Sequence, residues 1–185
     1  MIDGQFLPEC PQLKILRLDD SLYFGSVAHV GEILRRYREH YPEQKHLFLL
    51  TKGISQVDLS GAELLVSEAH ERRAIGGDLY LYRLRDTAAK VFNRGGYKDE
   101  IGEANIFDAK EEAIPAIFER LDKNICATCE NRIFLECKTV PKKKPESELT
   151  GETADSTAAE AVPAPAEASV TPTAEAVTQK PAWPW

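Results

Sequence analysis

The sequence predicts an α/β domain with a mainly parallel sheet, followed by a polar tail. Residues 1–140 alternate between strand-like and helix-like hydrophobic periodicity, which is typical of that fold class. The run KHLFLL (45–50) is continuously apolar, as expected of a central strand with both faces buried. After Val140 the chain becomes rich in Pro, Ala, Glu, Thr and Ser. The 185 residues therefore provide one domain of ordinary size and an extension.

The chain before KHLFLL predicts two strands and a helix. LKILRL (13–18) and SLYFG (21–25) have strand character, and Asp19-Asp20 between them suits a turn. We expect these two segments to form an antiparallel hairpin at one edge of the sheet. Ser26 can cap the helix predicted over 26–41, because apolar side chains recur on one face of that segment.

The chain after KHLFLL predicts alternating helices and strands. A helix from about Ser60 to Ile75 ends at Gly76-Gly77, where a left-handed C-cap is allowed. The remaining elements are expected at 78–84 (strand), 86–94 (helix), 104–107 (strand) and 108–122 (helix, capped by Asp108). Because an interior proline removes a backbone hydrogen bond, we expect the last helix to break at Pro115 or to start there. Helical crossovers between successive strands make the sheet mainly parallel.

Composition argues against several classes of protein. The longest aliphatic and aromatic run, Leu47–Leu50, is far shorter than the roughly 18 to 20 apolar residues that cross a bilayer. The first residues lack the basic start of a secretory signal, so we expect a cytoplasmic location. A formal net charge of -7 argues against nucleic acid as a partner. The four cysteines are too few and too unevenly spaced for a secreted disulfide scaffold.

The clearest site candidate is VDLSGAELL (57–65), which follows the central strand after a short loop. It lies at the carboxyl end of that strand, where ligands and partners of open α/β sheets usually bind. Ser60 and Glu63 have capping-box spacing, so Ser60 is expected to be the helix N-cap. Asp58, just outside, is favoured by the positive end of the helix dipole. Alternatively, exposed amides at this helix start bind a phosphate or sulfate.

Three blocks of the sequence resemble successive parts of a STAS domain: LKILRLDDSLYFGSVAHV, KHLFLLTKGISQVDLSGAELL and NRGGYKDEIGEANIFDAKEEAI. The segment SLYFGS is similar to the version at the cytoplasmic C-terminus of SulP-type anion permeases, and anti-sigma-factor antagonists usually lack it. The resemblance implies a STAS domain at 11–124, with an antagonist-like sheet flanked by about four helices. A Cys-containing extension at 125–140 would follow. The tail at 141–185 is expected to be disordered, because it buries too little apolar surface to offset its ordering entropy.

The resemblance also implies a function, which is a role in regulating, trafficking or assembling an anion transporter, usually for sulfate, without catalysis. The partner would be the membrane part of a SulP-type transporter, at the inner face of the membrane, or another cytoplasmic regulatory protein. Self-association is left open. The partner-binding or anion-binding loop would comprise Asp58, Leu59, Ser60, Gly61 and Ala62. A stand-alone antagonist that binds a regulatory kinase or a sigma-factor inhibitor is the alternative.

One position departs from the antagonists that are switched by phosphorylation. Their modified serine or threonine follows the aspartate directly, and this sequence has Leu59 at that position. Leucine has no hydroxyl group, so we expect no partner-switching phosphorylation at this loop. Leu59 and the SLYFGS segment both favour the transporter-associated hypothesis over the stand-alone antagonist.

A second candidate site is ICATCENRIFLEC (125–137), which contains Cys126-x2-Cys129 and Cys137. Paired thiolates can bind zinc or iron, but a closed structural site needs four ligands and this segment supplies three. Cys10 or a partner chain could provide the fourth. The other hypotheses are thiols without a special function, and a redox pair or enzyme, although a redox C-x2-C usually opens a helix after an early strand.

Overall fold

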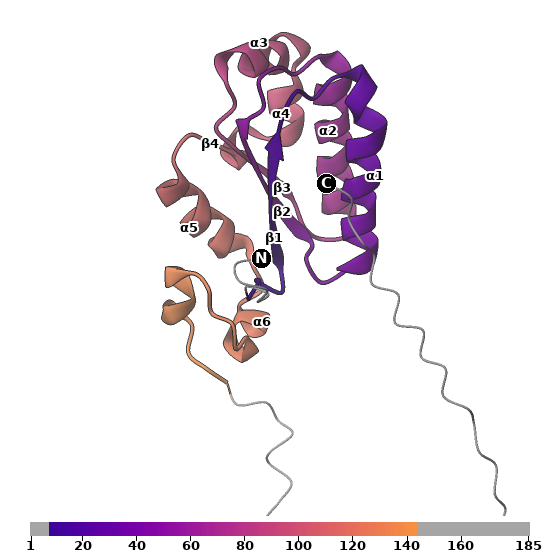
Figure 1. Cartoon of the computed structure of the whole chain (residues 1–185). Coiled ribbons are helices and arrows are strands. Elements are labelled where there is room, and N and C mark those ends of the chain that lie inside the picture. The colour runs from indigo at the N-terminus through magenta and orange to yellow at the C-terminus, as the bar shows by residue number, and fades with distance from the viewer. Residues whose placement is uncertain (1–7, 144–185) are drawn as a thin grey trace, which may run out of the picture. The chain divides into compact units, whose positions relative to one another are not determined.

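A computed structural model describes residues 8–143 of the chain, so the predicted disorder of the tail falls outside the described residues from 144 onward. Strands and helices alternate in this range (Figure 1). The strands are β1 (Leu13–Asp19), β2 (His46–Gly53), β3 (Leu79–Tyr82) and β4 (Ile106–Phe107). The α-helices are α1 (Phe24–His40), α2 (Leu59–Ala74), α3 (Asp86–Gly95), α4 (Tyr97–Ile101), α5 (Lys110–Arg120) and α6 (Lys123–Thr128). Two short 3-10 helices are η1 (Glu103–Asn105) and η2 (Leu135–Thr139).

The four strands of residues 8–143 form one parallel sheet in the order β1-β2-β3-β4. β2 pairs with β1 from Leu13↔His46 onward and with β3 from Leu47↔Leu79 onward. Each connection between neighbouring strands passes through at least one helix, which is how parallel strands must be joined. The predicted central strand and parallel sheet are therefore confirmed.

Helices cover both faces of the sheet, and each face has its own apolar core. Leu47 and Leu49 of β2 belong to a core shared with α1, α2, α3 and α4. Phe48 of β2 and Tyr80 of β3 belong to a second core, shared with α5, α6 and η2. Figure 1 shows α1 and α2 on one side of the strands and α5 on the other. This two-sided burial explains the continuous apolar run of β2.

The predicted antiparallel hairpin is wrong. β1 ends at Asp19, and Asp20 has a left-handed backbone with φ 89°. Leu22 then forms a single parallel bridge with Val57, and α1 begins at Phe24. Within the apolar segment SLYFG only Leu22 is buried. Leu22 is therefore the one side chain of this segment that packs in the core. Tyr23 and Phe24 lie exposed on the surface and are not part of a strand.

Helix starts also differ from the prediction. α1 begins two residues before Ser26, whose Oγ accepts a hydrogen bond from the Tyr23 amide at 3.1 Å. α5 has Ala109, not Asp108, at its N-cap position and no side-chain cap. Six α-helices lie in the described range instead of about four, because α4 and α6 are too short to produce a recognisable hydrophobic period.

The predicted glycine C-cap of α2 is confirmed. Gly76 adopts a left-handed backbone with φ 79°, and its amide donates to the Arg73 carbonyl at 3.0 Å. The Gly77 amide donates to the Arg72 carbonyl at 2.8 Å. These two bonds form a Schellman motif, in which the left-handed position is one that glycine adopts without steric cost.

Pro115 lies inside α5, which neither breaks nor starts there. The proline has no amide hydrogen for the Glu111 carbonyl, one helical turn earlier. Its ring is exposed, while Ala113, Ile117 and Phe118 of the same helix are buried. Burial of that apolar face keeps the helix intact despite the missing backbone bond.

Replacing Pro115 with alanine is expected to stabilise the protein by about 1 to 2 kcal/mol. Alanine restores the amide donor and favours the helix interior by roughly 3 kcal/mol over proline, part of which is offset by the freer unfolded chain. Urea unfolding of the 185-residue chain measures the change. A lower midpoint for Pro115→Ala would mean that the fixed proline backbone is needed at this position.

Candidate functional site

The loop before α1 and the loop before α2 are joined at the carboxyl edge of the sheet. The Leu22 amide donates to the Gln56 carbonyl at 2.9 Å, and the Asp58 amide donates to the Leu22 carbonyl at 3.1 Å. Gly61 allows the two segments to approach, because a Cβ atom at this position would lie 2.3 Å from the Leu22 carbonyl oxygen. Two stretches of sequence more than thirty residues apart are thus joined by backbone hydrogen bonds into one continuous surface.

Asp58 caps α2 and also contacts the start of α1. Its Oδ1 accepts from the Gly61 amide at 2.9 Å, and its Oδ2 accepts from the Phe24 amide at 2.9 Å. Helix starts leave amide donors unpaired, and one carboxylate here serves two of them. The same hydrogen bonds, chiefly that from Gly61 and then that from Phe24, lower the pKa of Asp58 below its ordinary value.

The prediction that Ser60 caps α2 is wrong. Asp58 is the last extended residue, with φ -98° and ψ -175°, because its amide is held by Leu22. Ser60 is already helical, so its hydroxyl is past the cap position. With Asp58 as N-cap the third helical residue is Gly61, which has no side chain to complete a capping box. The N-terminus of α2 is thus occupied by a carboxylate of its own chain, which weakens the anion-binding hypothesis for this loop.

Three apolar side chains around Asp58 are exposed. Phe24 is 80% exposed, Leu59 58% and Tyr23 51%. Of the five predicted loop residues, Gly61 and Ala62 are buried, so only Asp58, Leu59 and Ser60 reach the surface. We call Tyr23, Phe24, Asp58 and Leu59 the Asp58 surface. The sequence pattern missed Tyr23 and Phe24 because their apolar character was assigned to a strand.

The cysteine segment packs against the second core. Cys10, Cys126 and Cys137 are buried there, and Cys129 is half-buried. The Gln12 side-chain amide donates to the Cys126 Sγ at 3.3 Å and to the Asp122 carbonyl at 3.0 Å. All four cysteines are thiols without a disulfide. Burial raises the pKa of Cys126 and of Cys10, which favours the neutral thiol over the thiolate that binds metals.

No group of three or more His, Cys, Asp or Glu side chains within residues 8–143 is arranged to hold a metal ion. The zinc or iron hypothesis for Cys126, Cys129 and Cys137 therefore has no support from the geometry, and it stays a prediction. Metal analysis of protein purified without chelator tests it. Stoichiometric zinc or iron would establish a site despite this arrangement of the side chains.

Comparison with known proteins identifies the domain. Residues 6–113 match the family model of the STAS domain, which is more than half of the chain. The chain belongs to the STAS domain family. A sulfate transporter family protein from Wolinella succinogenes has a TM-score of 0.52 at 20% identity, over 65% of this chain and 94% of that one. No curated protein matches the sequence.

Similar STAS folds occur in transporters and in antagonists. The murine anion transporter Solute Carrier 26 family member A9 has a TM-score of 0.54 at 19% identity, over 60% of this chain but only 18% of the transporter. The anti-sigma factor antagonist SpoIIAA of Bacillus has a TM-score of 0.50 at 20% identity, over 61% of this chain and 94% of that protein. At such identities the likeness establishes the fold alone. Among the helices of residues 8–143, none has the length and apolarity to cross a membrane.

Proposed function

We propose that this STAS domain is a non-catalytic regulatory module that binds the membrane part of a SulP-type transporter for sulfate or another inorganic anion, on the cytoplasmic side. The observation that carries the proposal is the Asp58 surface, in which exposed apolar side chains surround a carboxylate. The resemblance places Leu59 where the switched antagonists have a hydroxyl, which also favours the transporter. The likeness in fold to the Wolinella and murine transporter proteins supports it.

The Asp58 surface has the properties of a preorganised docking site. Phe24 and Leu59 begin two neighbouring helices, and each large apolar side chain gains free energy when a partner removes it from water. The Asp58 carboxylate and the Leu22 backbone fix both helix starts, so little conformational entropy is lost on binding. A partner surface with apolar pockets and a hydrogen-bond donor for Asp58 would complement it.

Affinity capture with the full chain as bait, from detergent-solubilised membranes of the native cell, tests this proposal. We expect a SulP-type transporter among the retained proteins, identified by mass spectrometry. Phe24→Ser combined with Leu59→Ser is expected to reduce its retention about tenfold or more, since each lost apolar anchor costs roughly 1 kcal/mol or more. The matched control is Leu135→Ser, because Leu135 is 76% exposed in η2 and lies outside the Asp58 surface. Equal retention by all three baits would overturn the proposed surface.

The second candidate is a stand-alone regulator like the antagonists, but without their phosphorylation switch. The fold shared with SpoIIAA favours it, and Leu59 argues against a switch. The same capture experiment distinguishes the two, because a soluble kinase or sigma-factor inhibitor would be retained in place of a transporter. The coding sequence upstream of Met1 discriminates independently: in-frame apolar segments long enough to span a membrane favour the transporter.

Ser60 is expected to carry no phosphate in the native cell. It is half-buried in the first turn of α2, beside the Asp58 carboxylate, whose negative charge disfavours a second anion. Intact-mass and phosphopeptide analysis of the chain isolated from that cell measures this. Substantial phosphate on Ser60 would contradict the prediction and favour the stand-alone regulator.

A further inference from the structure

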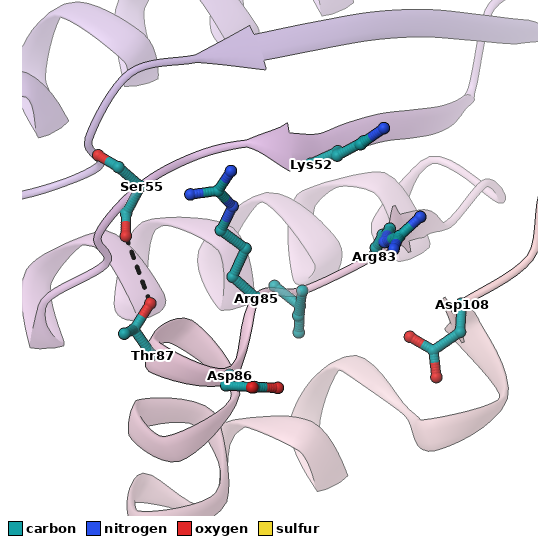
Figure 2. Close-up of a pocket in the computed structure, with 8 residues that line it drawn as sticks. Lys52, Ser55, Arg83, Arg85, Asp86, Thr87 and Asp108 are labelled. Carbon is teal, nitrogen blue, oxygen red and sulfur yellow. Dashed lines mark hydrogen bonds between the residues drawn. The ribbon is translucent and has the colours of Figure 1, made fainter.

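A basic pocket lies at the carboxyl edge of the sheet, between the ends of β2 and β3. Its volume is about 540 Å³. It is lined by Lys52, Ser55, Arg83, Leu84, Arg85, Asp86, Thr87 and Asp108. Figure 2 shows the Lys52, Arg83 and Arg85 side chains around the hollow, together with those of Asp86 and Asp108. Neither predicted site includes this pocket, because its residues come from three separate segments of the chain: the end of β2 and the loop after it, the end of β3 with the start of α3, and Asp108 after β4.

The three cations of the pocket have no acidic partner. None of Lys52, Arg83 and Arg85 forms an ion pair within 4.0 Å, or a side-chain hydrogen bond, with any residue from 8 to 143. Asp86 and Asp108 line the same pocket without such a pair, so three positive charges face two negative ones. Elsewhere in this range arginines are often paired with carboxylates, as Arg35 is with Glu32. The basic side chains of the pocket are therefore available to an anion.

The backbone supports the same interpretation. Arg83 adopts a left-handed conformation with φ 61°, which side-chain-bearing residues rarely take and glycine takes easily. Its amide donates to the Phe107 carbonyl at 2.7 Å, which holds the residue in place at the end of β3. The start of α3 follows at Asp86, and its N-cap residue Arg85 makes no side-chain cap. The first-turn amides of α3 thus add partial positive charge to the basic side of the pocket.

We infer that this pocket binds a small tetrahedral dianion, which is sulfate or hydrogen phosphate. Arg83 and Arg85 provide planar guanidinium donors and Lys52 provides an ammonium group, all of which suit oxyanions, whereas the Thr87 hydroxyl donates to the Ser55 carbonyl at 3.3 Å. The start of α2 offers no comparable anion site, because the Asp58 carboxylate already accepts the hydrogen bond from the Gly61 amide there. This anion site does not depend on the proposed docking role of the Asp58 surface, and its variants leave that surface unchanged.

Amide NMR of the ¹⁵N-labelled 185-residue chain tests the inference. Sodium sulfate and sodium phosphate are titrated separately at low salt, with sodium chloride at equal ionic strength as the reference. We expect saturable shifts around Lys52 and from Arg83 to Thr87 with one or both dianions. Comparison of the two titrations identifies which ion is preferred. Identical shifts with chloride would overturn the site.

Charge variants with a matched control complete the test. Arg83→Gly and Arg85→Gln are each expected to weaken dianion binding about tenfold, the effect of losing one charge-assisted hydrogen bond. Arg83→Gly should keep the fold, because glycine suits φ 61°. Asp108→Asn should strengthen binding, since it removes a repelling carboxylate. The control is Lys90→Gln, which removes an exposed positive charge from α3 outside the pocket. The affinity of this variant for the dianion should change less than about twofold. Equal weakening by Lys90→Gln and the pocket variants would refute the inference.

Discussion

Replacing Glu68 with alanine is expected to lower the free energy of unfolding by about 3 to 5 kcal/mol, because it leaves a buried positive charge without its partner. Glu68 is 3% exposed and Arg72 is 1% exposed. The Arg72 Nε donates to Glu68 Oε1 at 2.8 Å, and Arg38 of α1 donates to Glu68 Oε2. Burial already lowers the pKa of Arg72, with Glu68 opposing that shift.

The expected loss of stability exceeds that of the Glu68–Arg72 ion pair alone, because the cluster of Arg38, Glu68 and Arg72 connects three parts of the fold. Glu68 links α2 to α1 through Arg38, and the Arg72 Nη1 donates to the Gln44 carbonyl at 2.6 Å in the turn before β2. Urea unfolding measures the effect. Glu71→Ala is the matched control, since Glu71 lies on the same helix, is exposed and is 3.9 Å from Arg38. Glu71→Ala should lower the free energy of unfolding by less than about 1 kcal/mol.

A double variant separates charge from packing. Glu68→Leu with Arg72→Met removes the two fully buried charges and keeps apolar volume, so it should recover part of the stability that Glu68→Ala loses. Arg38, which is 19% exposed, then keeps only its 3.9 Å pair with Glu71. If Glu68→Ala were no more harmful than Glu71→Ala, the buried pair would have no role in holding α1 against α2.

Replacing Asp58 with alanine is expected to cost about 2 kcal/mol, roughly the effect of losing two helix-start hydrogen bonds. The Gly61 and Phe24 amides would both lose their side-chain acceptor. Thermal unfolding gives the stability change, and amide hydrogen exchange at the first turns of α1 and α2 locates it. Asp108→Ala is the control, because Asp108 precedes α5 without capping it. An equal loss of stability in Asp58→Ala and Asp108→Ala would contradict the role of Asp58 as hydrogen-bond acceptor for both helix starts.

The contribution of Asp58 to stability should decrease at low pH. The folded-state pKa of Asp58 lies below its ordinary value of 3.8, because the Gly61 and Phe24 amides stabilise the charged form. A depressed pKa contributes stability above pH 3.8, and this contribution disappears as pH falls through the lower folded-state value. The stability difference between the wild type and Asp58→Asn should therefore narrow below about pH 4. A difference that stays constant down to pH 2 would show that the carboxylate charge is not responsible.

The sequence predicted those features whose causes are local or periodic. Continuous burial identified β2, alternation of strands and helices gave the parallel sheet, and the Gly76-Gly77 pair marked the end of α2. Three ordered blocks indicated the family, which the match over residues 6–113 confirms. The start of α2 at the loop with Asp58 was predicted to within one residue, although its cap was assigned to Ser60. That error arose because Ser60 and Asp58 both suit an N-cap, and only the fold selects between them. The binding role of the loop stays a prediction.

The sequence by itself determined the fold class, the central strand and the presence of Leu59, which has no hydroxyl group, directly after Asp58. Tertiary structure decided the rest, because the deciding contacts join residues far apart in the chain. The bridge between Leu22 and Val57 replaced the predicted hairpin, left Tyr23 and Phe24 exposed, and made Asp58 the cap of α2 as well as a contact for α1. Folding likewise brought Lys52 and Arg83 to one pocket, since parallel strands end at the same edge of a sheet.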